Sequence, residues 1–185
     1  MMSLYELRVR VKDIEPPVWR ELRLRGDTTL DKLHEVMQVA MGWTDSHLYL
    51  FHAGGEKYGE PDPEWEKVRD SARTTLEDIV RETGRSFVYE YDLGDSWMHE
   101  VTVSGPVEAA GRREAAGDER PRCTGGARAC PPEDCGGPYR YQVLLKAISD
   151  SRHEEHDELL AWIGDDFDPE AFDARSVDAA LEQMR

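Results

Sequence analysis

The chain has 185 residues, a net charge of −16 and a sequence isoelectric point near 4.7, and 39% of its residues are hydrophobic. A chain of this length can bury a core without disulfide bonds, and five Trp, seven Tyr and four Phe supply bulky side chains for it. Binding to duplex nucleic acid depends on Lys and Arg side chains that displace counterions, so direct nucleic-acid binding is not expected of so acidic a protein.

The first residues predict a β-hairpin. Residues 5–11 alternate apolar and charged side chains, a pair of prolines interrupts the pattern, and residues 18–24 resume it. The hairpin also carries a local basic patch, which we interpret as solvated strand faces rather than as a nucleic-acid surface. The patch consists of Arg8, Arg10, Arg20, Arg23 and Arg25.

A helix is predicted next, over residues 28–42, where the apolar side chains fall on one helical face. Thr28 and Asp31 resemble a capping box at its start, and Gly42 is a suitable C-cap. Two strands follow, so the element order is hairpin, helix, strand, strand, as in a β-grasp unit. These two strands are expected at residues 47–52 and 56–58.

The middle of the chain predicts a loop, a short helix and a second hairpin. The loop covers the charged, proline-bearing residues 61–73, and the helix covers residues 76–81. The strongest hairpin signal in the chain joins residues 86–92 to residues 96–107 through a turn at residues 93–95.

The last part of the chain changes from irregular to helical patterns. Residues 109–120 are rich in Ala, Gly and charge and are expected to be mobile, and residues 121–138 form a loop rich in Gly and Pro that carries all three cysteines. Helices are predicted at residues 139–149, at residues 154–164 and after Asp168, which precedes a proline and a glutamate suited to a helix start.

These elements predict an α+β fold: a β-hairpin, a helix and further antiparallel strands in β-grasp-like order, followed by a helical C-terminal part. We expect a single domain over residues 1–185, of which residues 139–185 form the acidic helical end. Residues 149–185 contain 12 Asp or Glu against 3 Arg, a net charge of −9. The chain shows no signal-peptide pattern and no run of about 18 apolar residues, and we expect a cytoplasmic protein without a membrane span.

Four long motifs cover nearly the whole chain, from Tyr5 to about Leu181. They are YELRVRVKDIEPPVWRELRL, TTLDKLHEVMQVAMGWTDSHLYLF, FVYEYDLGDSWMHEV, and CTGGARACPPEDCGGPYRY leading to DDFDPEAFD. Together these motifs resemble the plasmid pRi open-reading-frame-three-like family. Arg140 departs from the family pattern, which usually has Gly before the tyrosine of the last motif.

The resemblance implies an α+β fold and no agreed activity. Some members of that family are labelled insertion-element passenger or resolvase-type proteins, which implies an association with plasmids or mobile elements. A serine recombinase needs a nucleophilic Ser among several Arg and a basic DNA-binding module beside it. This sequence has no helix-turn-helix signal and a net charge of −16, so we reject catalytic resolvase activity.

The three cysteines are candidate zinc ligands. Cys123, Cys130 and Cys135 are separated by six and by four residues, and a structural zinc ion needs four tetrahedral N or S ligands. Because no CxxC pair is present, the alternative is three reduced thiols that are partly buried in a folded loop. The fourth ligand would be a histidine, and the candidates in order of preference are His99, His47 and His52.

The DLGDSWMH segment is a second candidate site, because it places Asp92, Asp95, Trp97 and His99 near one hairpin turn. A histidine beside carboxylates can act as a general base or as a metal ligand. The alternative is ordinary turn chemistry. In that case both aspartates accept hydrogen bonds from turn amides, Gly94 supplies a positive φ, and His99 lies in the core on the same strand face as Trp97.

Two acidic residues in the cysteine segment complete the candidates. Glu133 and Asp134 directly precede Cys135 and are suited to act as ligands or as acids in a cleft. The alternative is an acidic cap on the following turn. The chain contains neither a GxxxxGK[ST] phosphate loop nor a GxSxG nucleophile elbow.

The sequence therefore favours a soluble binding or accessory protein without an established catalytic activity. Its strand edges and acidic tail would provide the surface for a protein partner. The alternative is a metal-dependent enzyme or a zinc-stabilised site built from the three cysteines and His99, with neighbouring carboxylates as accessory groups. A third hypothesis, an accessory role with nucleic acid, follows from the mobile-element label alone.

Overall fold

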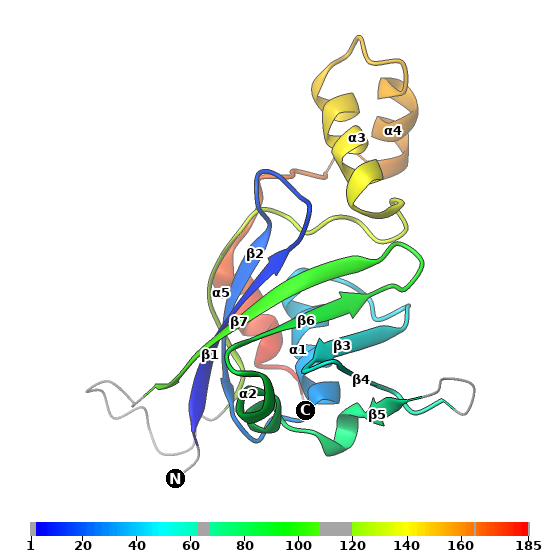
Figure 1. Ribbon diagram of the computed structural model, residues 1–185. Coiled ribbons are helices and arrows are strands. Elements are labelled where there is room, and N and C mark those ends of the chain that lie inside the picture. Colours follow the sequence, from blue (N-terminus) through cyan, green and yellow to red (C-terminus); the bar gives the residue numbers. More distant parts are fainter. Residues whose placement is uncertain (1–2, 63–66, 108–119, 165, 185) are drawn as a thin grey trace.

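The computed structural model describes residues 3–62, 67–107, 120–164 and 166–184, and a mixed sheet of eight strands lies at its centre (Figure 1). The strands are β1 (Leu4–Val11), β2 (Trp19–Arg25), β3 (Tyr49–Ala53), β4 (Glu56–Gly59), β5 (Val68–Asp70), β6 (Ser86–Tyr91), β7 (Trp97–Val107) and β8 (Arg122–Ala127). The helices are α1 (Leu30–Met41), α2 (Leu76–Thr83), α3 (Gly137–Ser149), α4 (His156–Ile163) and α5 (Ala174–Leu181), with a short 3₁₀ helix at Ser71–Arg73.

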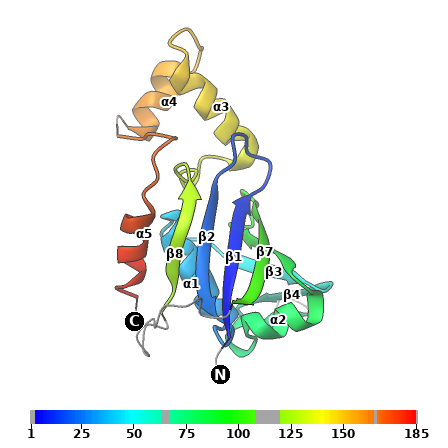
Figure 2. The ribbon, with the colours of Figure 1, turned by 90° about the vertical axis from the view of Figure 1, so that its left-hand side faces the viewer.

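The strands follow the order β5-β4-β3-β6-β7-β1-β2-β8, and every neighbouring pair is antiparallel except β4 with β5, which is parallel. The predicted α+β class and the order of hairpin, helix, strand and strand are confirmed. In the two views, α1 lies against one face of the sheet and the α3–α4 pair extends beyond the end of the β1–β2 hairpin (Figures 1 and 2).

The first hairpin forms because its apolar side chains alternate, as predicted. Tyr5, Leu7, Val9 and Val11 are all buried, and Leu7 lies opposite Leu22 of β2. A strand with this period buries one face against the core and leaves the other to solvent.

The patch of five arginines on this hairpin divides between the two faces. The prediction of a solvated position is wrong for Arg20, because this residue is only 3% exposed and its Nε donates to the Ala40 carbonyl at 2.8 Å. In β2 it lies two residues before Leu22 and four before Leu24, so it shares their core face. The other four lie on the solvent face as predicted, and each pairs with an acid: Arg8 with Glu21, Arg10 with Glu15, Arg23 with Glu6 and Arg25 with Asp27.

The ends of α1 are only partly as predicted. Gly42 ends the helix in a left-handed conformation, with φ 84°, and donates to the Gln38 carbonyl. The predicted capping box of Thr28 and Asp31 is wrong, because the N-cap is Thr29 and it makes no side-chain capping bond. A capping box occurs instead at α2, where Thr75 and Asp78 bond reciprocally.

Two segments predicted as loops contain strands. Residues 122–127, in the cysteine segment, form β8 at the edge of the sheet against β2, and residues 68–70 form β5 against β4. An edge strand needs only one hydrogen-bonded partner, so a glycine-rich sequence can occupy it. The segment 109–120, expected to be mobile, lies outside the described residues except for Arg120.

The predicted helical C-terminal part is confirmed, with a later start for its last helix. Asp173 caps α5 by accepting from the Arg175 amide at 3.1 Å, whereas Asp168 accepts from the Glu170 amide in a preceding turn. The chain then returns along β8, where α5 packs, and buries Leu181 in the core (Figure 2). Each helix in the described ranges falls short of the length and apolar character needed to cross a membrane.

Candidate functional site

The four predicted zinc ligands do not form one cluster of ligand atoms among the described residues. Cys123 is buried on β8, Cys130 and Cys135 follow in the loop before α3, and His99 is fully buried on β7. Among the residues that the structure describes, no three of these four ligand atoms lie within 4.8 Å of one another. The geometry therefore does not support the zinc site proposed on them.

His99 lies in the aromatic core, on the same face of β7 as the buried Trp97, as the turn alternative predicts. Its ring lies 5.3 Å from that of Trp43 and 5.2 Å from that of Tyr89, and its Nδ1 is 3.2 Å from the Tyr89 carbonyl. Burial lowers the pKa of His99 to about 4, so the imidazole is neutral at neutral pH.

The cysteines have the character of protonated thiols. Burial raises the pKa of all three thiols, to about 12 for Cys135. A thiol must lose its proton to bind zinc or to act as a nucleophile. These surroundings favour the alternative of three reduced thiols in a folded segment.

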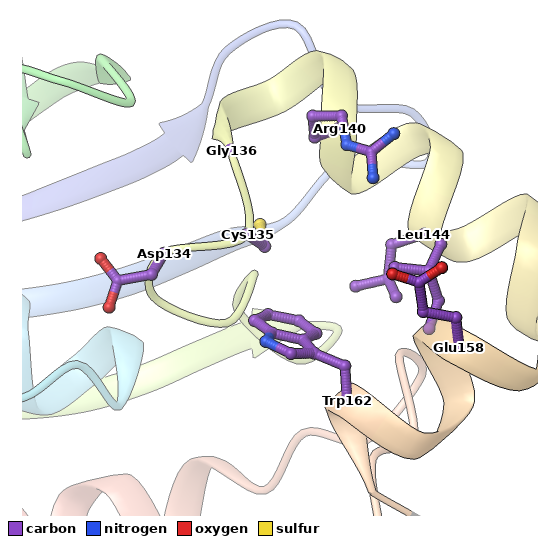
Figure 3. A pocket seen from close by; sticks show the side chains of 8 residues that line it. Asp134, Cys135, Gly136, Arg140, Leu144, Glu158 and Trp162 are labelled. Carbon is purple, nitrogen blue, oxygen red and sulfur yellow. The ribbon is translucent and has the colours of Figure 1, made fainter. Parts of the chain in front are cut away.

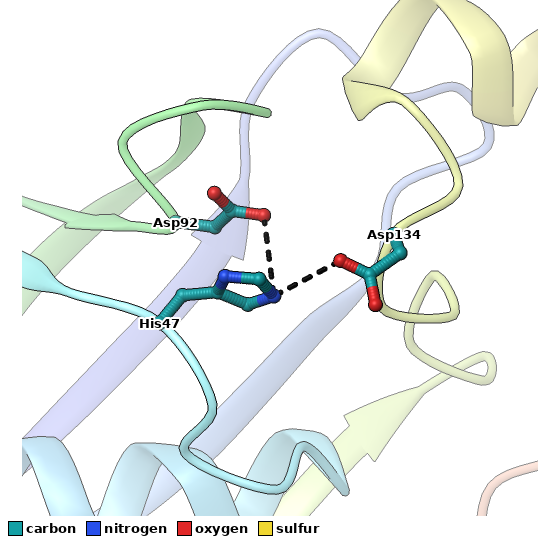
Figure 4. A group of neighbouring side chains, drawn as sticks. All are labelled: His47, Asp92 and Asp134. Carbon is teal, nitrogen blue, oxygen red and sulfur yellow. Dashed lines mark ion pairs between the residues drawn. The ribbon is translucent and has the colours of Figure 1, made fainter.

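A different group brings three potential ligand atoms together (Figure 4). His47 lies in the loop between α1 and β3, Asp92 directly follows β6, and Asp134 lies in the loop between β8 and α3. His47 Nε2 is 3.0 Å from Asp134 Oδ1 and 3.7 Å from Asp92 Oδ2. All three ligand atoms lie within 4.8 Å of one another, and we call these residues the triad.

The separation of 3.0 Å between His47 and Asp134 matches that between two ligands of a single metal ion, and the separation of 3.7 Å between His47 and Asp92 is a few tenths of an ångström longer. Two atoms that each bind one ion at about 2.1 Å lie about 3.0 to 3.4 Å apart at octahedral or tetrahedral angles. The Nε2 atom of His47 is shielded from solvent and makes no hydrogen bond of normal geometry, although Asp134 Oδ1 is only 3.0 Å away. The nitrogen is thus placed between two carboxylates without being bonded linearly to either.

The turn after β6 orients Asp92. Its Oδ1 accepts from the amides of Gly94 at 3.0 Å and Asp95 at 3.3 Å, which leaves Oδ2 as the oxygen nearest His47. The prediction that Gly94 supplies a positive φ is wrong, because Asp92 and Ser96 adopt it, with φ 56° and 55°.

Asp95 connects the same turn to the cysteine segment. Its Oδ2 accepts from the Gly136 amide at 3.0 Å, rather than from a turn amide as predicted. A Cβ atom at Gly137 would lie only 2.6 Å from the Asp95 carbonyl oxygen, so the two backbones approach as closely as glycine allows. This contact brings the loop of Asp134 next to Asp92.

One hydroxyl group connects all three loops of the triad. Tyr91 accepts from the Ser46 amide at 3.0 Å and donates to Glu133 Oε1 at 2.6 Å. Ser46, Tyr91 and Glu133 directly precede His47, Asp92 and Asp134, respectively, in the sequence.

Glu133 is a positioning residue in this arrangement. Its other oxygen, Oε2, accepts from the Thr44 amide at 3.1 Å and from the Thr44 hydroxyl at 2.6 Å. The predicted alternative, an acidic cap on the turn that follows Glu133, is therefore wrong for this residue, which instead bonds the loop after α1. Burial and the hydrogen bond to Glu133 raise the pKa of Tyr91, so its hydroxyl stays protonated.

A buried network anchors the loop that carries His47. His34 Nε2 lies 2.7 Å from Asp45 Oδ1, and its Nδ1 lies 2.7 Å from the Tyr89 hydroxyl, which also accepts from Gln38 at 3.0 Å. Burial, opposed by Asp45, lowers the pKa of His34, so the neutral ring donates to Asp45 and accepts from Tyr89. Sequence reasoning did not find His34, because a single histidine within a helix has no local signature.

Of the other predicted candidates, His52 is apart from the triad and pairs with Glu90 at 2.7 Å. A pocket of about 410 Å³ lies beside the triad, between α3, α4 and the loop at residues 134–136 (Figure 3). Asp134 belongs to both the triad and the pocket wall, and its carboxylate points away from the Trp162 ring (Figure 3).

Comparison with known proteins identifies the family. A family model described as plasmid pRiA4b ORF-3-like protein matches residues 3–176. The chain belongs to this family. The resemblance seen in the sequence motifs is therefore confirmed.

Two similar proteins illustrate how far the similarity extends. The chain is 38% identical to the uncharacterized protein y4hQ of Sinorhizobium fredii over 185 residues, covering 98% of this chain and 92% of that protein. It is 32% identical to a protein of unknown function, MM3350 from Methanosarcina mazei Go1, whose crystal structure superposes with a TM-score of 0.82 over 95% of this chain and 98% of that one. Neither relative has a stated activity, so the chemistry of the site follows from its geometry.

Proposed function

We propose that the protein is a binding or accessory protein that holds one divalent transition-metal ion at the triad. The ligand atoms are His47 Nε2, Asp92 Oδ2 and Asp134 Oδ1. The observation that carries the proposal is their separation, 3.0 and 3.7 Å from the histidine nitrogen, in loops that are held together by the Tyr91 hydroxyl.

The ligand set indicates the class of ion. One imidazole nitrogen and two carboxylate oxygens suit Zn²⁺, Mn²⁺ or Fe²⁺, whereas the soft thiolates that would favour Cu⁺ are absent from the triad. Zinc prefers four ligands and manganese six, so three protein ligands leave coordination positions for water or for a second ligand. Such an open site binds a further molecule through the ion.

The same open positions support a second candidate function, that of a metal-dependent hydrolase. An ion in such a site lowers the pKa of its bound water and can activate it as a nucleophile. A turnover of nitrophenyl esters or phosphates that disappears in His47→Ala would favour this function over a purely binding role.

The cellular location of the protein, its partners and its domain organisation are part of the same proposal. The three free cysteines and the acidic composition support residence in the cytoplasm, and the acidic C-terminal helices offer a surface for a protein partner. The predicted single domain over residues 1–185 is supported by α5, which returns to pack on β8. Pairing of the outward arginines of the first hairpin with acids supports the view that nucleic acid is not bound directly there.

Metal titration of chelator-treated protein tests the proposal. We expect about one equivalent of Zn²⁺ or Mn²⁺ to bind in isothermal titration calorimetry, and His47→Ala to weaken binding by at least about tenfold. His52→Ala is the matched control, because His52 is also partly exposed and pairs with the carboxylate of Glu90 outside the triad. Stoichiometry below about a tenth of an equivalent, or equal losses in the two variants, would overturn the proposal.

A further inference from the structure

The pocket between α3 and α4 has features that the triad does not explain. Trp162 is 50% exposed there, one of the few large apolar side chains at the surface of the described residues. Its ring makes no aromatic or cation–π contact with any other described residue. A large indole face is therefore open to a ligand on the wall of a cavity of about 410 Å³.

The carboxylate of Glu158 lies on the same pocket wall as the indole of Trp162. Glu158 precedes Trp162 by one helical turn on α4, so the two side chains project from the same face. Within the described ranges, the side chain of Glu158 makes no hydrogen bond or ion pair, whereas that of Arg140 on the opposite wall is paired with Glu155 at 3.2 Å. Of the charged side chains in the pocket wall, Glu158 is thus unpaired, whereas Arg140 pairs with Glu155 and Asp134 pairs with His47.

Two leucines supply the aliphatic part of the wall. Leu144 of α3 and Leu159 of α4 line the space next to Trp162, and Glu158 projects into the gap between the two helices (Figure 3). A volume of about 410 Å³ is within the range of small-molecule sites. An aromatic face within reach of a carboxylate attracts cations, since the ring quadrupole and the carboxylate charge act in the same direction.

We propose that this pocket binds an organic ammonium ion with an alkyl chain. The ammonium group sits against the Trp162 face within reach of Glu158, and the chain lies along Leu144 and Leu159. The negative charge of −9 over residues 149–185 increases the local concentration of such cations. This site is separate from the metal proposal, because its ligand-contacting groups are not members of the triad.

Three probes of equal chain length and different charge test this proposal: cadaverine, pentanediol and glutarate. Each is titrated into the full chain by calorimetry, with the indole N–H signals followed by NMR. We expect cadaverine to bind at least about tenfold more tightly than pentanediol, and glutarate not to bind measurably. Comparable affinities for cadaverine and pentanediol would overturn the proposal.

Substitutions in the pocket test whether cadaverine binds there. Glu158→Gln and Trp162→Leu are each expected to weaken cadaverine binding by at least about fivefold. Asp157→Asn removes the same charge from the neighbouring, exposed position of α4 and is expected to change it by less than about twofold. Equal effects of Glu158→Gln and Asp157→Asn would show general attraction to the acidic helices and reject the pocket. His47→Ala should leave cadaverine binding intact, so failure of the metal site and failure of this site are distinguishable.

Discussion

The hydroxyl of Tyr91 donates to Glu133 Oε1 across 2.6 Å, and each of these two residues directly precedes a carboxylate of the triad. The same hydroxyl accepts from the Ser46 amide, next to His47. A single oxygen atom therefore fixes the relative positions of three loops that come from distant parts of the chain. A metal site depends on such outer contacts, because they hold the ligands in place before the ion arrives.

Tyr91→Phe removes this oxygen and keeps the ring that stacks on Trp43 at 4.8 Å. We expect zinc affinity to fall by about tenfold and the free energy of unfolding to fall by about 1 kcal/mol. Calorimetry and denaturant unfolding measure the two effects.

Tyr58→Phe is the control for that substitution. Tyr58 is also buried, and its hydroxyl also donates to a glutamate, Glu82, at 3.1 Å, but it lies apart from the triad. It should lose a similar amount of stability without a change in metal affinity. If Tyr91→Phe binds zinc as tightly as the unaltered protein, the hydroxyl does not position the ligands.

Gly137→Ala tests the contact between the two site loops. Gly137 has φ 77°, and an added Cβ would lie 2.6 Å from the Asp95 carbonyl oxygen, which is rigid backbone. We expect the loop of Asp134 to move away from Asp92 and zinc affinity to fall by at least about tenfold. Calorimetric titration with Zn²⁺ measures this change.

Gly55→Ala separates the clash from the backbone conformation. Gly55 has a similar φ of 84°, but a Cβ there would meet no atom within 4 Å. This variant should lose about 1 kcal/mol of stability from the left-handed conformation alone and keep its metal affinity. A loss of affinity in both variants would mean that lower stability, rather than the loop contact, weakens the site.

Stability should fall with acidification through the titration of His99. Its pKa is about 4 in the folded protein, below the ordinary value of 6.5, because the ring is fully buried. As the pH falls from 6.5 to 4, the unfolded chain takes up a proton that the folded protein does not, so unfolding becomes more favourable. This difference corresponds to about 3 kcal/mol across that window.

His99→Phe removes this proton uptake and should flatten the dependence of unfolding free energy on pH between 6.5 and 4. Denaturant unfolding at several pH values gives the slope, which is independent of any constant change in packing. His34, whose pKa is also lowered by burial, should leave part of the slope in place. Identical slopes for the variant and the unaltered protein would contradict the expectation that titration of His99 lowers stability in acid.

Local sequence patterns predicted most of the strands and helices, but they did not predict which elements pair or pack with one another. The alternation of Tyr5, Leu7 and Val9 predicted β1 because strand burial has a period of two. The start of α1 was misplaced because it depends on distant backbone, where Leu30 donates to the Thr74 carbonyl at 2.9 Å and Leu76 donates to the Thr28 carbonyl at 2.9 Å. A local capping rule contains no information about that pairing.

The candidate site shows the same limit. The sequence nominated His47, Asp92 and Asp134, but not as one group: His47 was a possible fourth ligand for the cysteines, Asp92 belonged to the hairpin turn, and Asp134 belonged to the cysteine segment. Only the folded loops bring them together, through contacts such as that of Asp95 with Gly136. The cysteines drew attention because of their spacing, yet burial on β8 and in the following loop gives each thiol surroundings that disfavour the thiolate.

Arg20, the inward arginine of the first hairpin, should contribute more to stability than an outward arginine of the same hairpin. Arg20 donates to the carbonyls of Ala40 at 2.8 Å and Ala127 at 3.0 Å, and its guanidinium lies 4.4 Å from the ring centre of Phe172. Arg20→Leu would leave these buried carbonyl groups without their donor, and we expect a loss of about 3 kcal/mol in the free energy of unfolding. Arg8→Leu, on the outer face of the same hairpin, removes an exposed ion pair with Glu21 and should cost less than about 1 kcal/mol. Denaturant unfolding of the two variants compares them directly. Equal losses would mean that the hydrogen bonds of Arg20 do not stabilise the junction of β2, α1 and β8.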